Sequence, residues 1–113
     1  MNKRIKCDNP LIKKTTFDKK CPKNFYKIGL ATNIHSYYHF YRQNSNGLWD
    51  HKDGGKKITK YDASNKLIFN PQIANRNYDK IRNYDNWCGY YCVPTNNYIK
   101  TNMSRIKLNK LLY

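Results

Sequence analysis

The sequence predicts a single small domain of the α+β class, mainly β, built on an antiparallel sheet of three to four strands. Between residues 25 and 52, three short segments rich in aromatic and branched side chains alternate with polar turn residues, which is typical of an antiparallel meander. The 113 residues include eleven Tyr, two Trp and four Phe, and each of these side chains can bury a large area. A chain of this length forms one domain, so an enzyme with separate cofactor and substrate domains is excluded.

The chain divides into three regions. Residues 1–24 are a basic arm, for which we expect an irregular conformation because Pro10 and Pro22 interrupt any helix. Residues 25–97 hold the β-rich domain. Residues 98–113 are a basic C-terminal segment whose apolar side chains fit helical spacing and, at 106–108, strand spacing; its length favours a helix.

The second and third segments of the meander are joined by Asn-Ser-Asn-Gly at 44–47, a sequence that favours a tight hairpin turn. A three-residue loop at 45–47 fixes the register, and the predicted pairs are Asn44 with Leu48, Arg42 with Asp50, and Tyr41 with His51. Side chains alternate between the two sides of a strand, so one face is predicted to carry aromatic and imidazole groups. These groups are Tyr37, His39, Tyr41, Trp49 and His51.

The segment that follows the hairpin is less regular. A short strand is expected at 66–70, where turn residues lie on both sides of Leu-Ile-Phe. Asn70 and Pro71 are suited to begin a helix of two or three turns, as the N-cap and the first helical residue. The helical periodicity after Pro71 is weak, so an irregular loop is an equal alternative.

The charge is strongly positive, with 22 Lys and Arg against 7 acidic residues and a net charge of +15. Such a surface is expected to associate with nucleic acid or another polyanion. The candidate contact residues are Lys13, Lys14, Lys19, Lys20, Lys23, Arg42, Lys52, Lys56 and Lys57. A genome rich in A and T is the alternative explanation, because its codons enrich Lys and Asn without any binding role. All seven acidic residues are Asp, and the absence of Glu excludes HExxH metalloproteases, zinc deaminases and EF-hands.

His39 and His51 are the candidate catalytic groups, because a nucleophilic cysteine needs an imidazole nearby to lower the pKa of its thiol. The four cysteines, Cys7, Cys21, Cys88 and Cys92, are candidates either for a reactive thiol or for disulfides. A disulfide from the arm to the core would tether a segment that has few other reasons to be ordered. Zinc held by Cys88, Cys92 and histidine is a further alternative, although the C-x3-C spacing is only permissive, and we expect no metal or cofactor.

Membrane association is not expected, because no stretch approaches the roughly 18 apolar residues that a spanning helix needs. The N-terminal segment has positive charges but no apolar segment behind them, so we expect no secretion by a signal peptide.

Three blocks carry a resemblance to a known group of proteins: YYHFYRQNSNGLWDHKDGG at 37–55, DASNKLIFNPQIANRNY at 62–78, and WCGYYCVP at 87–94. Together they resemble an uncharacterised family that occurs in giant DNA viruses of the mimivirus type and in some bacteria. Longer bacterial relatives are similar to papain-like cysteine hydrolases, with an Asn-Cys-aromatic segment that opens a helix upstream of these blocks. By this resemblance the catalytic histidine corresponds to His39, with His51 as the second candidate.

The sequence departs from that pattern where the nucleophile would lie, because it has no Asn-Cys-aromatic motif before the first expected strand. The resemblance therefore implies a shortened, noncatalytic relative. Together with the net charge of +15, it predicts a small basic viral protein in the virion or the host cytoplasm, whose partners are nucleic acid or another polyanion and other virion proteins. A shortened cysteine hydrolase that keeps His39 as an active or vestigial catalytic group is the alternative. Giant viruses encode thiol oxidases, so disulfides are compatible with the absence of a signal peptide.

Overall fold

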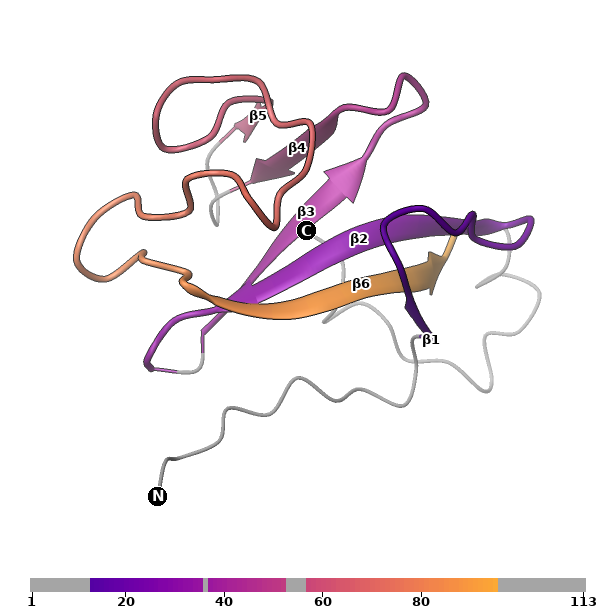
Figure 1. The fold of residues 1–113 in the computed structure, drawn as a ribbon, viewed down its shortest axis with the longest axis horizontal. Helices are drawn as coiled ribbons and strands as arrows, with labels where there is room; N and C mark the ends of the chain where they lie inside the picture. The colour runs from indigo at the N-terminus through magenta and orange to yellow at the C-terminus, as the bar shows by residue number, and fades with distance from the viewer. Residues whose placement is uncertain (1–12, 36, 53–56, 96–113) are drawn as a thin grey trace.

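The structure, a computed structural model, describes residues 13–35, 37–52 and 57–95, which form one antiparallel sheet of six strands (Figure 1). The strands are β1 (Lys13–Thr15), β2 (Phe25–Thr32), β3 (Tyr38–Gln43), β4 (Trp49–Lys52), β5 (Ile58–Thr59) and β6 (Asn86–Pro94). Their order in the sheet is β1-β6-β2-β3-β4-β5. The described residues contain no helix, and hence no helix that could span a membrane. The mainly β class is confirmed, whereas the predicted helix at 98–113 lies outside the described residues.

The sheet is larger than the three to four strands that the sequence predicts, because two segments outside the meander join it. WCGYYCVP belongs to β6, which pairs with β2 along its whole length. The basic arm is not irregular throughout, since Lys13–Thr15 pairs with β6 as an edge strand. Lysines on a short edge strand discourage pairing with another chain, which suits the sequence of β1 to its position.

The predicted hairpin register is confirmed. Tyr41 pairs with His51 and Arg42 with Asp50, while the backbone N–H of Asn44 donates to the carbonyl of Leu48 at 2.8 Å. Gly47 closes the turn with φ at 89°, a left-handed conformation that glycine adopts without a steric penalty.

The two faces of the sheet have different compositions. One face, here the aliphatic face, buries Ile28, Leu30, Cys88, Tyr91 and Val93 in a single cluster. The other, here the imidazole face, carries His39, Tyr41, Trp49, His51 and Tyr90, all of them buried. Gly29 also lies on the imidazole face, and a Cβ atom there would lie 2.6 Å from Trp87 Cη2. Glycine at this position therefore lets the Trp87 ring lie directly on β2.

Residues 60–85, here the covering loop, lie over the imidazole face (Figure 1). The helix considered after Pro71 does not form, and the alternative of an irregular loop is confirmed. The reason is local competition, because Asp and Asn side chains accept hydrogen bonds from backbone N–H groups two to four residues ahead. After Pro71 the acceptors of these turns are Asn75 and Asp79. Asp62 forms a similar turn earlier in the loop, and Asn70 accepts from Gln72 N–H as an N-cap would, but the helix does not continue.

The strand expected at 66–70 is reduced to two isolated bridges, Trp49 with Ile68 and Tyr61 with Leu67. Arg76 holds the covering loop from inside. Its guanidinium donates to the carbonyls of Tyr84 at 2.7 Å and Pro71 at 2.9 Å. The loop is therefore fixed by polar contacts as well as by the burial of Ile68.

The segment between β1 and β2, residues 16–24, is here the arm loop, and it folds back on the imidazole face through three contacts. A disulfide joins Cys21 to Cys92, 71 residues apart in sequence. The buried ammonium of Lys27 donates to the carbonyls of Thr16 and Phe17, both at 2.7 Å. The Phe17 ring stacks on Trp49 with the ring centroids 6.3 Å apart. Among the alternatives for the cysteines, a disulfide that tethers the arm to the core is therefore the one found for Cys21 and Cys92.

Candidate functional site

The two histidines that the hairpin register brings together are in direct contact. His39 lies on β3 and His51 on β4, and the distance from His39 Nε2 to His51 Nδ1 is 2.9 Å. Both side chains are buried, with exposed fractions of 5% and 3%. A buried pair of imidazoles on neighbouring strands is therefore the chemical centre of this face.

The hydrogen bonds assign the protons of the neutral pair. His51 Nε2 lies 2.8 Å from the carbonyl oxygen of Tyr61, which can only accept, so His51 carries its proton on Nε2. His51 Nδ1 is then an acceptor, and His39 donates its Nε2 proton to it. Two successive hydrogen bonds therefore link His39 on β3 to His51 on β4, and His51 to the carbonyl of Tyr61 in the covering loop.

Tyrosine rings enclose the pair. Tyr84 stacks on His39 with centroids 4.5 Å apart and an interplanar angle of 10°, and the Tyr41 ring meets His39 edge-on at 5.0 Å. The hydroxyls of Tyr41 and Tyr78 share a hydrogen bond of 2.8 Å. Tyr78 Oη also lies 3.4 Å from His51 Nε2. The two imidazoles and the phenol hydroxyls of Tyr41 and Tyr78 thus form one hydrogen-bonded network between the imidazole face and the covering loop.

The burial of this network changes its acid–base properties. Burial, together with the charges of His51 and Arg82, lowers the pKa of His39 from 6.5 to about 3. Burial also lowers the pKa of His51, although the hydrogen bond to Tyr61 acts in the opposite direction. Burial raises the pKa of Tyr78 to about 12. Both imidazoles are therefore neutral at neutral pH.

A cavity of about 320 Å³ opens beside the histidine pair. The cavity is lined by the histidine pair, by β5 and the residue just before it, and by the covering loop. The lining residues are His39, His51, Lys57, Thr59, Tyr61, Asp62, Asn65, Tyr78 and Arg82. Arg82 Nε donates to Asp79 at 2.8 Å. Burial raises the pKa of Asp62, but hydrogen bonds from backbone N–H groups outweigh this and lower it overall. The Asp62 carboxylate therefore stabilises the turn of the covering loop through these hydrogen bonds.

The histidines meet, but the structure does not place a thiol beside them. Cys88 packs with Ile28 and Leu30 on the aliphatic face, on the opposite side of the sheet from His39. Cys88 is also disulfide-bonded, and the part of the chain that the structure describes contains no free cysteine. A zinc site from Cys88, Cys92 and histidine is not formed, since both sulfurs are in disulfides. Cys7 lies outside the described residues.

The predicted basic residues do not form one patch. Lys13, Lys14, Lys19, Lys20 and Lys23 are exposed on β1 and the arm loop. Half-buried Lys52 and exposed Lys57 lie toward the other edge of the sheet, at β4 and β5. Exposed Arg42 lies over the ring of Tyr26, 4.6 Å from its centroid, on the aliphatic side of β3. Lys56 lies outside the described residues.

The sequence did not identify the cavity residues of the covering loop. Tyr61, Tyr78 and Arg82 come from a segment with no regular secondary structure, so no periodicity places them on the face of the histidines. The cluster of Asp and Asn turns is the one local signal that this segment folds back on itself.

Comparisons with known proteins give a local similarity. Insoluble matrix shell protein 1 from Ruditapes philippinarum is 44% identical to the chain over 39 residues. This segment covers 34% of the chain and 26% of the shell protein. No family model matches the chain, and no solved structure matches it.

Proposed function

We propose that this chain is a noncatalytic basic protein that binds nucleic acid or a similar polyanion through the lysines of β1 and the arm loop. The observation that carries this proposal is that the arm loop is fixed to the sheet. The Cys21–Cys92 disulfide, Lys27 and Phe17 hold it, while Lys19, Lys20 and Lys23 remain exposed. A fixed array of ammonium groups loses less conformational entropy on binding phosphates than a free tail does.

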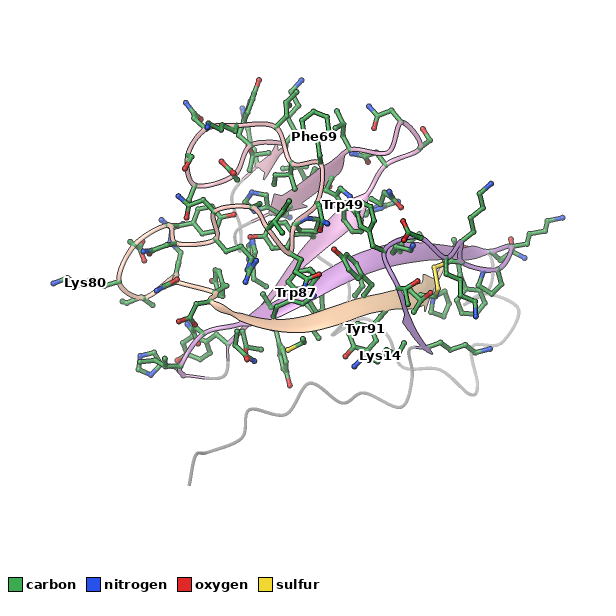
Figure 2. The ribbon with its side chains drawn as sticks, in the orientation of Figure 1. Lys14, Trp49, Phe69, Lys80, Trp87 and Tyr91 are labelled. Carbon is green, nitrogen blue, oxygen red and sulfur yellow. A yellow bond between two sulfur atoms is a disulfide. The ribbon has the colours of Figure 1, made fainter. Side chains whose placement is uncertain are left out.

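Neighbouring charges extend this surface. Lys13 and Lys14 on β1 add two exposed ammonium groups at the edge of the sheet. Lys13 pairs with Cys92 on the side of the arm loop, whereas Lys14 pairs with Tyr91 and points to the aliphatic face. Lys14 lies near Tyr91 in Figure 2, below the sheet as drawn. Few acidic groups oppose these charges, since the whole chain has seven. The attraction is expected to be nonspecific in sequence, because phosphates carry no base information.

The test is the salt dependence of binding to a fluorescently labelled single-stranded oligonucleotide, measured by anisotropy. The wild-type affinity should fall steeply as salt rises. A triple variant, Lys19→Gln, Lys20→Gln and Lys23→Gln, should bind more weakly and reduce the salt slope by about 2, because each lost single-strand phosphate contact contributes about 0.7.

A matched control removes the same charge elsewhere. Lys60, Lys66 and Lys80 are exposed on the covering loop, and Lys80 extends into solvent in Figure 2. Their triple replacement by Gln should leave the affinity and the salt slope close to wild type. Equal weakening by both triple variants would show that net charge alone drives association, and absence of binding at low salt would refute the proposal.

The resemblance of the three sequence blocks to giant-virus proteins supports a location in the virion or the host cytoplasm, where packaged DNA and other virion proteins are the expected partners. Mass spectrometry of purified particles tests this location. A cysteine hydrolase activity is the weaker alternative, because Cys88 and His39 lie on opposite faces of the sheet and all described cysteines are in disulfides.

A further inference from the structure

We propose that the cavity beside the histidine pair binds a dianionic phosphate group between Lys57 and Arg82, and that the His39–His51 pair takes up one proton when it does so. This site is separate from the lysines of the arm loop. It involves a small ligand in a cavity rather than a polymer on the surface.

The volume and lining of the cavity fit such a ligand. At about 320 Å³ it is at the small end of the range for small-molecule sites, roughly 300–1,000 Å³. Two cationic side chains line it, Lys57 and Arg82, and Arg82 also donates through Nε to the Asp79 carboxylate at 2.8 Å. The acidic lining group, Asp62, accepts hydrogen bonds from the backbone N–H groups of Ser64, Lys66 and Asn75. Two cations favour a dianion over a carboxylate, which needs only one. The Tyr61 and Tyr78 side chains provide walls for a small organic group attached to the phosphate.

The pair can accept a proton without losing its internal hydrogen bond. In the neutral state His39 Nε2–H donates to His51 Nδ1, and His51 Nε2–H donates to Tyr61. If the proton adds to His39 Nδ1, both existing hydrogen bonds persist. If the Nε2 proton of His39 then moves to His51 Nδ1, His51 holds both of its protons and donates through Nδ1, while His39 accepts at Nε2 and carries the added proton on Nδ1. One added proton is therefore compatible with the geometry in either form.

The charges around the His39–His51 pair explain why the pair is protonated only when an anion binds. The titratable groups that face the pair are Tyr41, Tyr61, Tyr78 and Tyr84, Asp62, and Lys57 and Arg82. Asp50 lies on the other face of β4 and acts on His51 only through its charge, and Asp79 is ion-paired with Arg82. Burial, then the neighbouring His51, and then the positive charge of Arg82 lower the pKa of His39. A dianion beside Lys57 and Arg82 offsets that positive charge and favours an imidazolium.

Sulfate is the first probe, because it has the shape and charge of a phosphate dianion but does not titrate across the range in which histidine does. Any proton uptake on binding then belongs to the protein. Calorimetric titration with sulfate, in buffers of different ionisation enthalpy, should give an uptake approaching one proton and an affinity that rises up to tenfold for each pH unit of acidification. Binding without proton uptake, or no binding at mildly acidic pH, would overturn the proposal.

Variants locate the site. Lys57→Gln and Arg82→Gln should each weaken sulfate binding at least tenfold, whereas Lys80→Gln, on the same loop as Arg82 but outside the cavity, should not. Equal effects of Lys57→Gln and Lys80→Gln would indicate general attraction and refute the site. The wild-type protein provides an independent readout, since the ¹⁵N chemical shifts of both imidazoles should change from neutral to protonated values when sulfate is added.

The source of the phosphate group is distinguished by two further probes. Phenyl phosphate represents a small organic phosphate, and a dinucleotide with a 5′-phosphate represents the end of a nucleic acid, with the 5′-hydroxyl form as its control. Tight binding of phenyl phosphate assigns the site to small molecules, and preference for the phosphorylated dinucleotide assigns it to nucleic-acid ends. Binding of neither refutes the phosphate assignment even if the arm-loop lysines bind polyanions as proposed.

Discussion

The aliphatic and imidazole faces are built from alternate residues of the same strands, yet they depend on different interactions. Ile28 and Leu30 bury hydrocarbon, whose contribution to stability does not change with pH. His39 and His51 bury polar rings that must remain neutral and hydrogen-bonded. The aliphatic face and the disulfides therefore supply most of the free energy of unfolding. The imidazole face makes that free energy depend on pH.

The largest effect is expected from the bond that ties the arm loop to the imidazole face. Replacing both Cys21 and Cys92 by Ala removes a crosslink between residues separated by 71 positions and should cost about 4 kcal/mol. Urea unfolding of wild-type and variant protein measures the loss. A change below about 1 kcal/mol would mean that Lys27 and Phe17 hold the arm loop without the disulfide.

The next effect tests the aliphatic face. Leu30 is 3% exposed, and Leu30→Ala should cost about 3 kcal/mol because it leaves a cavity among the aliphatic side chains. The same loss should be found at neutral and at mildly acidic pH. A loss that changes with pH would contradict the separation of the two faces.

Acid should act on the other face. The pKa of His39 is lowered in the folded state to about 3, so its contribution is complete above pH 6.5 and is lost as the pH falls toward 3. The free energy of unfolding should decrease by about 1.4 kcal/mol per pH unit below 6.5 for each imidazole that stays neutral. His39→Gln should have a smaller slope than wild type, and an unchanged slope would assign the acid sensitivity to other groups.

The smallest expected effect compares two phenols that share one hydrogen bond. Tyr78→Phe leaves the hydroxyl of fully buried Tyr41 without its partner and should cost about 1–2 kcal/mol. Tyr41→Phe removes the buried hydroxyl and leaves half-buried Tyr78 with access to water, so it should cost less. Thermal unfolding of the two variants decides the order, and the reverse order would contradict the assigned network.

What could be predicted from the sequence was local. The Asn-Ser-Asn-Gly turn fixed the pairing of Tyr41 with His51 and hence the meeting of the two histidines, because a hairpin register depends on a few adjacent residues. The insertion of β6 between β1 and β2 joins segments far apart in sequence, and nothing in WCGYYCVP indicates its neighbours.

The covering loop shows the same limit in another form. Asn70 and Pro71 favour a helix by their positions, yet Asp62, Asn75 and Asp79 accept hydrogen bonds from the N–H groups of Asn75, Asn77 and Ile81, which a helix would use. These hydrogen bonds together favour an irregular loop over a helix. Which face of the sheet the loop covers depends on tertiary contacts, namely the burial of Ile68 and the hydrogen bonds of Arg76. Tyr61, Tyr78 and Arg82 reach the cavity only as a consequence of that fold.

The strand order has a consequence for how the molecule assembles as it leaves the ribosome. The meander of β2, β3 and β4 consists of sequential neighbours and can pair early, because little chain entropy is lost in closing short loops. β1 is synthesised first, but its neighbour in the sheet is β6, the last of the described strands to emerge. The first strand must therefore wait for the last one, and the lysines of β1 and the arm loop are set in place in the final stage of folding.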